Sequence, residues 1–126
     1  MLEVARERGL RVAWRDLGRR NGEYHSTGLI LLNPKRTITV QRVTLAHEIG
    51  HAEYGHARVN DPVLHARQER LADEFAADLL IDSGDYIAAE SVFGSHVGTL
   101  ARELGVTSGV VEAWRRRTSK LIAAAS

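Results

Sequence analysis

The spacing of apolar residues changes from every second position in the first third of the chain to every third or fourth position after it. Residues 10–14 alternate between apolar and mostly polar side chains, as in a half-buried strand. Residues 23–25 and 29–32 are interpreted as a second and a third strand, joined by a tight turn at residues 26–28. The pattern therefore predicts a small antiparallel sheet of about three strands.

Helical spacing dominates the next part of the chain. Residues 36–54 have the longest helical pattern, for which Thr37 or Thr39 could be the N-cap, and residues 63–81 have a second one. A shorter helix is predicted for residues 2–8. Together these elements predict an α+β fold, in which the sheet packs on the two long helices.

The last third of the chain has a different pattern. A short helix is predicted at residues 85–93, with Asp85 as its cap. Residues 97–115 then follow a helix-turn-helix pattern, with Gly105 at the turn. A compact helical bundle is therefore expected at this end of the chain.

Length and composition fit one globular domain with a small appendage. The chain has 126 residues, of which 44% are hydrophobic and 26% are charged, and its formal net charge is +1. No apolar run reaches the roughly 18 residues of a membrane span, and the lack of cysteine excludes disulfides and thiolate metal sites. We therefore expect a cytoplasmic protein, with one folded unit at residues 1–82 and a helical appendage at residues 83–126.

The helix predicted at residues 36–54 contains the sequence His-Glu-Ile-Gly-His at residues 47–51. Residues four apart lie on one face of a helix, so His47 and His51 are spaced to bind one metal ion. Glu48 lies beside them and could take a proton from a metal-bound water. Because burying two histidines and a glutamate without a partner is costly, this apolar segment favours a metal site.

A third protein ligand must be His, Glu or Asp, because the chain has no cysteine. Glu69 and Asp73 lie four apart on the second long helix, so Glu69 could bind the metal while Asp73 accepts the spare ring N–H of a histidine. Glu74 and Asp78 form a rival pair at the same spacing, and all four could instead belong to a solvated helix face. The other histidines are further candidates: His25, His56, His65 and His96.

Two segments resemble the ImmA/IrrE family of metallo-endopeptidases. They are residues 43–51 and residues 69–80, the second with the pattern E-x-x-A-D-x-F-A-A-x-L-L, and the similarity covers residues 1–82. One departure is Leu71, where many members of the family carry a second acidic residue.

The resemblance implies a role for each residue of the motif. His47, His51 and Glu69 would bind zinc, with manganese as an alternative metal. Glu48 would be the catalytic base, and Asp73 would support a ligand histidine. A donor that stabilises the oxyanion is also required. The sequence leaves five candidates open for it: Tyr24, His25, Tyr54, Tyr86 and His96.

The resemblance also implies a protein substrate, namely a helix-turn-helix repressor cut at one site to derepress a phage, a mobile element or a stress regulon. A competing hypothesis is a regulatory protein that binds DNA or a repressor and whose metal site is structural or latent. Residues 96–126 are basic, and Arg115, Arg116 and Arg117 could contact nucleic acid or a partner. Gly109 offers no side chain for reading bases, so substrate docking or domain packing is favoured over sequence-specific DNA binding.

Overall fold

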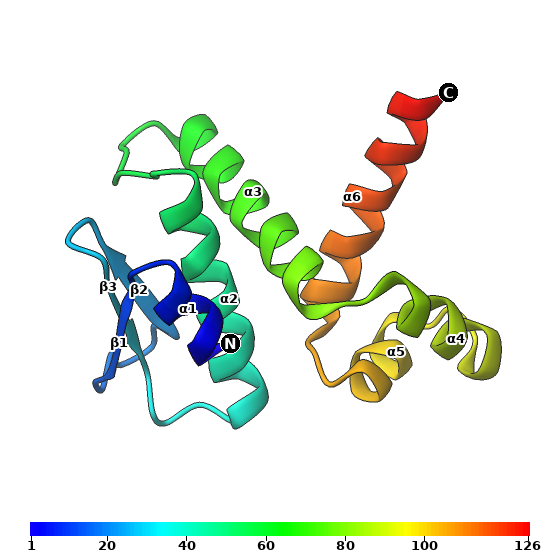
Figure 1. The fold of residues 1–126 in the computed structure, drawn as a ribbon, viewed down its shortest axis with the longest axis horizontal. Helices are drawn as coiled ribbons and strands as arrows, with labels where there is room; N and C mark the ends of the chain where they lie inside the picture. Colours follow the sequence, from blue (N-terminus) through cyan, green and yellow to red (C-terminus); the bar gives the residue numbers. More distant parts are fainter.

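The computed structural model describes residues 1–126 and places a small sheet and helix α1 at one end of the molecule (Figure 1). Helices α4, α5 and α6 lie at the other end, and α2 and α3 lie between the two. None of the helices combines the length and the apolar character that a membrane crossing requires. The elements in chain order are α1 (Leu2–Glu7), β1 (Arg11–Trp14), β2 (Gly22–His25), β3 (Leu29–Leu32), α2 (Ile38–Glu53), α3 (Pro62–Leu80), α4 (Ser83–Phe93), α5 (Val97–Leu104) and α6 (Ser108–Ala125).

The predicted α+β fold is confirmed, but the strands form a mixed sheet rather than the antiparallel sheet that we expected. The strand order is β1-β3-β2, in which β2 pairs with β3 antiparallel and β1 pairs with β3 in parallel. The physical reason is that β3 is the most apolar strand, with Ile30, Leu31 and Leu32 all buried, so it takes the central position. The chain between β1 and β3 includes β2 and is therefore long enough for a parallel crossover.

Two helix caps refine the predicted element boundaries. The Thr37 hydroxyl accepts a hydrogen bond from the backbone N–H of Val40 at 3.2 Å, which selects Thr37 over Thr39 as the cap of α2. The Asp82 carboxylate accepts a hydrogen bond from the backbone N–H of Asp85 at 3.0 Å. The prediction of Asp85 as the cap of α4 was therefore wrong, because the helix begins earlier, at Ser83.

Helix α2 is buried on two faces, because it packs against the sheet on one side and against α3 on the other (Figure 1). Leu45 and Ile49 belong to a core cluster with Ile30 and Leu32 of β3. Ala46 belongs instead to a second cluster, with residues of α3, α5 and α6. The helix that carries the two motif histidines is thus fixed from both sides, which gives the site a rigid support.

Gly50 lets α2 and α3 approach closely. A Cβ atom at this position would lie 3.0 Å from both the Cα and the carbonyl oxygen of Ala72, and 3.3 Å from the Cβ of Phe75. Backbone atoms cannot move aside as the end of a flexible side chain can, so a larger residue would push the two helices apart. The distance between the motif histidines and α3 therefore depends on this glycine.

We expect Gly50→Ala to lower the free energy of unfolding by up to about 2 kcal/mol, because overpacking costs about 1–3 kcal/mol and helix propensity returns only about 1 kcal/mol. The midpoint of thermal unfolding, followed by circular dichroism, measures the effect. Gly109→Ala is the matched control, because a Cβ there meets only the Oγ1 of Thr107, at 3.9 Å. An unchanged or higher midpoint for Gly50→Ala would contradict this account of the α2–α3 contact.

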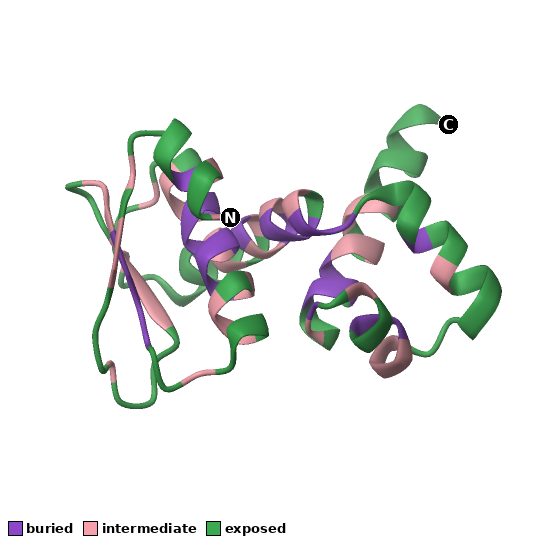
Figure 2. Ribbon diagram, turned by 60° about the horizontal axis from the view of Figure 1, so that its bottom comes forward, coloured by how far each residue is buried: buried purple, intermediate pink, exposed green.

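The helices at the C-terminal end share a core with α2 and α3. One cluster of buried apolar residues joins Ala46 of α2 and Ala76 of α3 to Val111 of α6. The last turns of α6 extend away from this core and are exposed (Figure 2). The units predicted at residues 1–82 and 83–126 are therefore packed together, and the division between them stays a prediction.

Candidate metal centre

His47 and His51 lie one turn apart on α2, and the Glu69 carboxylate reaches both of them from α3. The Nε2 atoms of His47 and His51 are 3.0 Å apart. Glu69 Oε2 lies 3.0 Å from Nε2 of His47, and Glu69 Oε1 lies 3.1 Å from Nε2 of His51. Two histidines from one helix and a carboxylate from the next thus converge on one small volume.

This group could hold a metal ion. Ligand atoms on a tetrahedral ion with bonds of 2.0–2.1 Å are about 3.3 Å apart, so the separations of 3.0–3.1 Å between Glu69 and the two histidine nitrogens require only a small outward shift. Two imidazole nitrogens this close also need a proton or a cation between them, because their lone pairs otherwise repel each other. Two imidazoles with one carboxylate are a donor set typical of zinc and similar divalent metals.

Each histidine of this group has a partner on its other ring nitrogen. Nδ1 of His47 lies 2.7 Å from Oδ1 of Asp73, so the ring donates its N–H to the carboxylate. Nδ1 of His51 lies 2.9 Å from Nδ1 of His56, so one of these two nitrogens must carry the proton. If a metal ion binds, the N–H of each of these histidines lies on Nδ1 and both Nε2 lone pairs point to the centre of the group.

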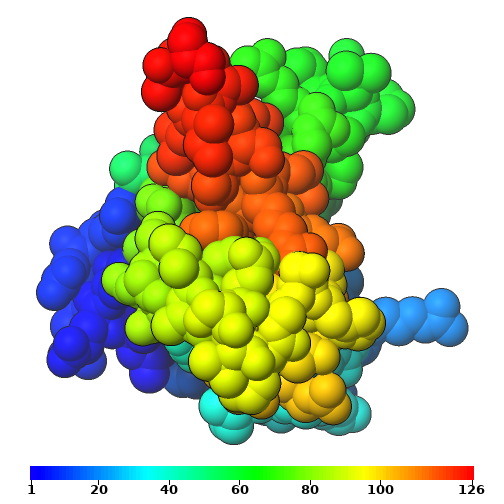
Figure 3. All heavy atoms as spheres, turned by 90° about the vertical axis from the view of Figure 1, so that its right-hand side faces the viewer, coloured from blue at the N-terminus to red at the C-terminus, as the bar shows by residue number.

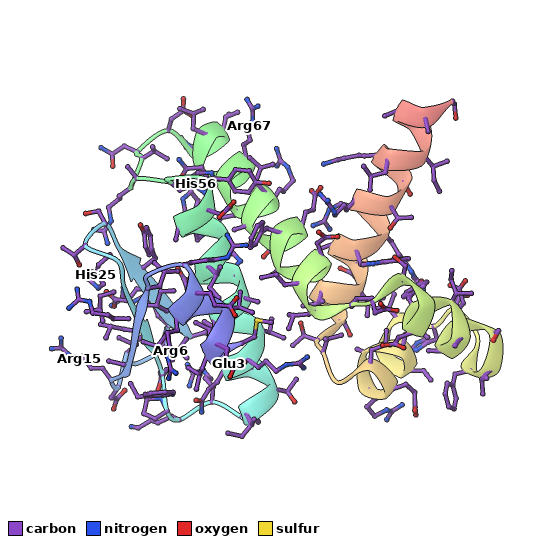
Figure 4. The ribbon with its side chains drawn as sticks, viewed as in Figure 1. Glu3, Arg6, Arg15, His25, His56 and Arg67 are labelled. Atoms are coloured by element: carbon purple, nitrogen blue, oxygen red, sulfur yellow. The ribbon has the colours of Figure 1, made fainter.

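His56 supports His51 from outside the motif helix. Gly55 follows the end of α2 with φ of +63°, a conformation that favours glycine, and this turn brings His56 back toward the helix. The ring of His56 stacks on that of Tyr54, with centroids 5.4 Å apart. Figure 4 shows His56 beside α2 and α3. The sequence offered His56 only as a rival metal ligand. Its position directly after a helix-ending glycine was the only feature of the sequence that pointed to a contact with His51.

We expect His56→Phe to weaken metal binding by about 10–100-fold, because partners of ligand histidines typically contribute that much to affinity. Phenylalanine keeps the stacking on Tyr54 but removes the nitrogen that faces His51. Competition with a chromophoric chelator measures the dissociation constant of the metal. His65→Phe, at an exposed position on α3, is the matched control and should bind as wild type does. Equal affinities for both variants would remove His56 from the site.

The charges of the cluster are set by its hydrogen bonds. Burial lowers the pKa of His47, but the hydrogen bonds to Asp73 and Glu69 outweigh it and raise that pKa to about 10. The hydrogen bonds with His47 and His51 hold the pKa of Glu69 well below its usual range, against the opposing effect of burial. The three residues therefore favour positive charge at their centre.

Glu48 is buried, with 8% of its surface exposed, and lines the same pocket as His47 and Glu69. Burial raises the pKa of its carboxyl group, and the neighbouring His47 and His51 act in the opposite direction. A carboxylate with a raised pKa, beside a group that could hold a metal ion, is suited to accept and return protons.

The pocket in front of this group has a volume of about 450 Å³. Its walls come from β2 with the loop before it, from α2, from α3 and from the start of α6. The lining residues are Arg20, Asn21, Gly22, Val43, Thr44, His47, Glu48, Glu69, Asp73, Ala76, Thr107, Gly109 and Val110.

The five candidate oxyanion donors do not line this pocket. His96 instead caps α5 by accepting a hydrogen bond from the backbone N–H of Thr99 at 3.3 Å. Tyr86 is buried and stacks on Trp114, with ring centroids 4.0 Å apart. The remaining candidates are Tyr24, which packs on the sheet core, His25, which pairs with Glu23, and Tyr54, which stacks on His56.

Arg20 and Asn21 are two polar side chains of the pocket whose place there the sequence did not predict. They belong to the Arg-rich turn before β2, which the sequence pattern presents only as surface. They lie opposite the motif helix because β2 packs beside α2, a contact that the sequence pattern does not predict.

Glu74, the rival candidate for the third ligand, faces α6 rather than the histidines. Its buried carboxylate accepts hydrogen bonds from Nζ of Lys120 at 2.9 and 3.0 Å. Asp78, the other member of the rival pair, forms an ion pair with Arg117 at 3.2 Å. This pair therefore fastens α3 to α6, and Glu69 is the carboxylate of α3 that contacts both histidines.

The three consecutive arginines of α6 are largely engaged within the protein. Nε of Arg115 donates a hydrogen bond to the hydroxyl of Tyr86 at 2.7 Å, and Arg117 pairs with Asp78. Arg116 is exposed. These contacts favour packing of α6 on the rest of the fold over the contact with nucleic acid that the basic sequence had left open.

Comparison with models of known protein families gives a match over most of the chain. A family model described as the IrrE N-terminal-like domain, Peptidase_M78, matches residues 5–113. The matched region includes every residue of the metal group and continues into α6. A search of curated proteins found no match.

Proposed function

Because the chain belongs to the peptidase family of IrrE N-terminal-like domains, we propose that it is a zinc-dependent endopeptidase. The observation that carries this proposal is the convergence of His47, His51 and Glu69 within about 3 Å of one another, next to the buried Glu48. Three protein ligands leave one position open for water, as in catalytic rather than structural zinc sites.

A bound zinc ion would acidify a water molecule and polarise the carbonyl group of the peptide bond to be cut. Glu48 would accept the proton of the attacking water and return it to the leaving amine. Asp73 and His56 would hold the ring orientations of the two ligand histidines. Arg20 and Asn21 line the pocket and are candidates to stabilise the developing oxyanion.

One edge of the sheet, strand β2, could bind an extended substrate peptide. β2 lies at an edge of the sheet, so one row of its backbone N–H and C=O groups is not paired within the sheet. Gly22, the first residue of β2, lines the pocket. An extended segment of a substrate could therefore pair with β2 and pass in front of Glu48.

The narrower part of the proposal concerns the substrate. The family of peptidases implies a protein substrate. The resemblance of residues 43–51 and 69–80 to the ImmA/IrrE enzymes supports a helix-turn-helix repressor, cut at a single site, as that protein.

Metal content and proteolysis together test this function. The protein and its His51→Ala variant are dialysed against zinc, washed and analysed for metal, and then incubated with a mixture of synthetic peptides. We expect about one zinc per chain and cleaved peptides for the wild type, and neither for the variant. Wild-type protein that stays free of zinc, or that cleaves no peptide with zinc bound, would overturn the proposal.

A further inference from the structure

The start of α6 forms one wall of the metal pocket. Thr107, Gly109 and Val110 line the pocket together with His47 and Glu48 of the motif helix. Figure 3 shows α4, α5 and α6 covering one side of the molecule as a continuous surface. The start of α6 thus contributes directly to the space that a substrate would enter.

Two kinds of contact with α2 hold this wall in place. The guanidinium of Arg42 on α2 donates a hydrogen bond to the carbonyl oxygen of Gly105, in the turn before α6, at 3.0 Å. Val110 and Val111 belong to the same core cluster as Ala46 of α2. The position of the wall relative to the motif helix is therefore fixed by packing and by a hydrogen bond.

The part of the pocket next to this wall is apolar. Val43, Ala76 and Val110 are the hydrophobic residues of the lining, and they come from α2, α3 and α6 respectively. Ala76 and Val110 are only 2% and 5% exposed, so they form the floor of this part of the pocket. The remaining lining is polar or lacks a side chain, and the apolar floor is thus a distinct feature.

Gly109 leaves room above this floor. Its φ is not in the left-handed region, so backbone strain does not require glycine at this position. A Cβ there would have only the Oγ1 of Thr107 within 4 Å, at 3.9 Å. A larger side chain could therefore be accommodated by the fold, and it would occupy open space at the pocket wall.

We propose that Val43, Ala76 and Val110 form a subsite that takes an apolar side chain of the peptide next to the bond that is cut, and that Gly109 sets how large this side chain can be. This inference rests on the proposed peptidase function. It assigns to α6 the role of a specificity determinant rather than that of a separate binding module.

The test compares the zinc-loaded wild type with Gly109→Leu on a peptide library in which the residues flanking the bond vary. The wild type should prefer large apolar residues at one flanking position. Gly109→Leu should lose about tenfold or more in kcat/KM for these peptides, because removing space in an apolar pocket discriminates by at least this factor. Peptides with alanine at the same position should be cut at close to the wild-type rate.

Two controls keep the interpretation specific. Ser108→Leu, on the same turn of α6 but outside the pocket lining, should keep the wild-type preference. Binding of a large apolar peptide to Glu48→Gln, with and without Gly109→Leu, should weaken in the double variant, which reports on the subsite without catalysis. A wild type that cuts peptides with no change of preference in Gly109→Leu would overturn this inference alone. A zinc-loaded wild type that cuts no peptide would overturn the peptidase function and this inference with it.

Discussion

Glu48→Gln is expected to lower kcat for peptide cleavage by about 10²–10⁴-fold while zinc stays bound. Glutamine has nearly the same shape and fills the same buried position, but it cannot accept the proton of the attacking water. Glu48 does not belong to the group of His47, His51 and Glu69 that could hold the ion, so metal content should not change. The measurement pairs steady-state cleavage of a fluorogenic peptide with elemental analysis of the same sample.

Glu53→Gln is the matched control for this substitution. Glu53 lies on the same helix, but its side chain is partly exposed and pairs with Arg8 away from the pocket. This variant should cleave peptides as the wild type does. Normal cleavage by Glu48→Gln would remove Glu48 from the role of general base and would direct attention to the other carboxylates of the pocket.

Glu69→Gln should have the second large effect, on metal binding itself. We expect its zinc affinity to fall by more than about a hundredfold, because residues that only support a ligand already contribute 10–100-fold. Peptide cleavage should then be lost at zinc concentrations that saturate the wild type. Titration with zinc in a competing chelator gives the dissociation constants.

Glu74→Gln separates the loss of a ligand from the general loss of a carboxylate on α3. The Glu74 side chain is buried against Lys120, so its removal should affect the attachment of α6 and leave the zinc affinity near that of the wild type. The opposite order, with zinc lost in Glu74→Gln and retained in Glu69→Gln, would show that the wrong carboxylate had been assigned to the metal.

Local patterns in the sequence predicted much of this molecule. The positions of the helices and strands follow from apolar spacing, and the pairing of His47 with His51 follows from helix geometry alone. The four-residue spacing on α3 predicted that Glu69 and Asp73 share one face, but Glu74 and Asp78 have the same spacing, so only the structure shows which pair lies beside the histidines.

The features that the sequence did not predict depend on contacts between distant elements. The parallel pairing of β1 with β3 results from competition among strands for the central position, which no single strand reveals. His56 reaches His51 only because of the turn at Gly55, and α6 reaches the pocket only through its packing on α2 and α3. The separation of ligand, base and support roles among the site residues stays a prediction until the variants are measured.

The wall that α6 forms in the pocket is absent until this last helix has been made and has packed onto the rest of the protein. The residues of the metal group are synthesised before α6, because α2 and α3 precede it in the chain. Until α6 packs onto Ala46 and Ala76, these apolar residues and one side of the pocket are open to solvent. Under the proposed function, a chain in which α6 has not yet packed would therefore hold its zinc ligands without the wall that sets which peptides it can cut.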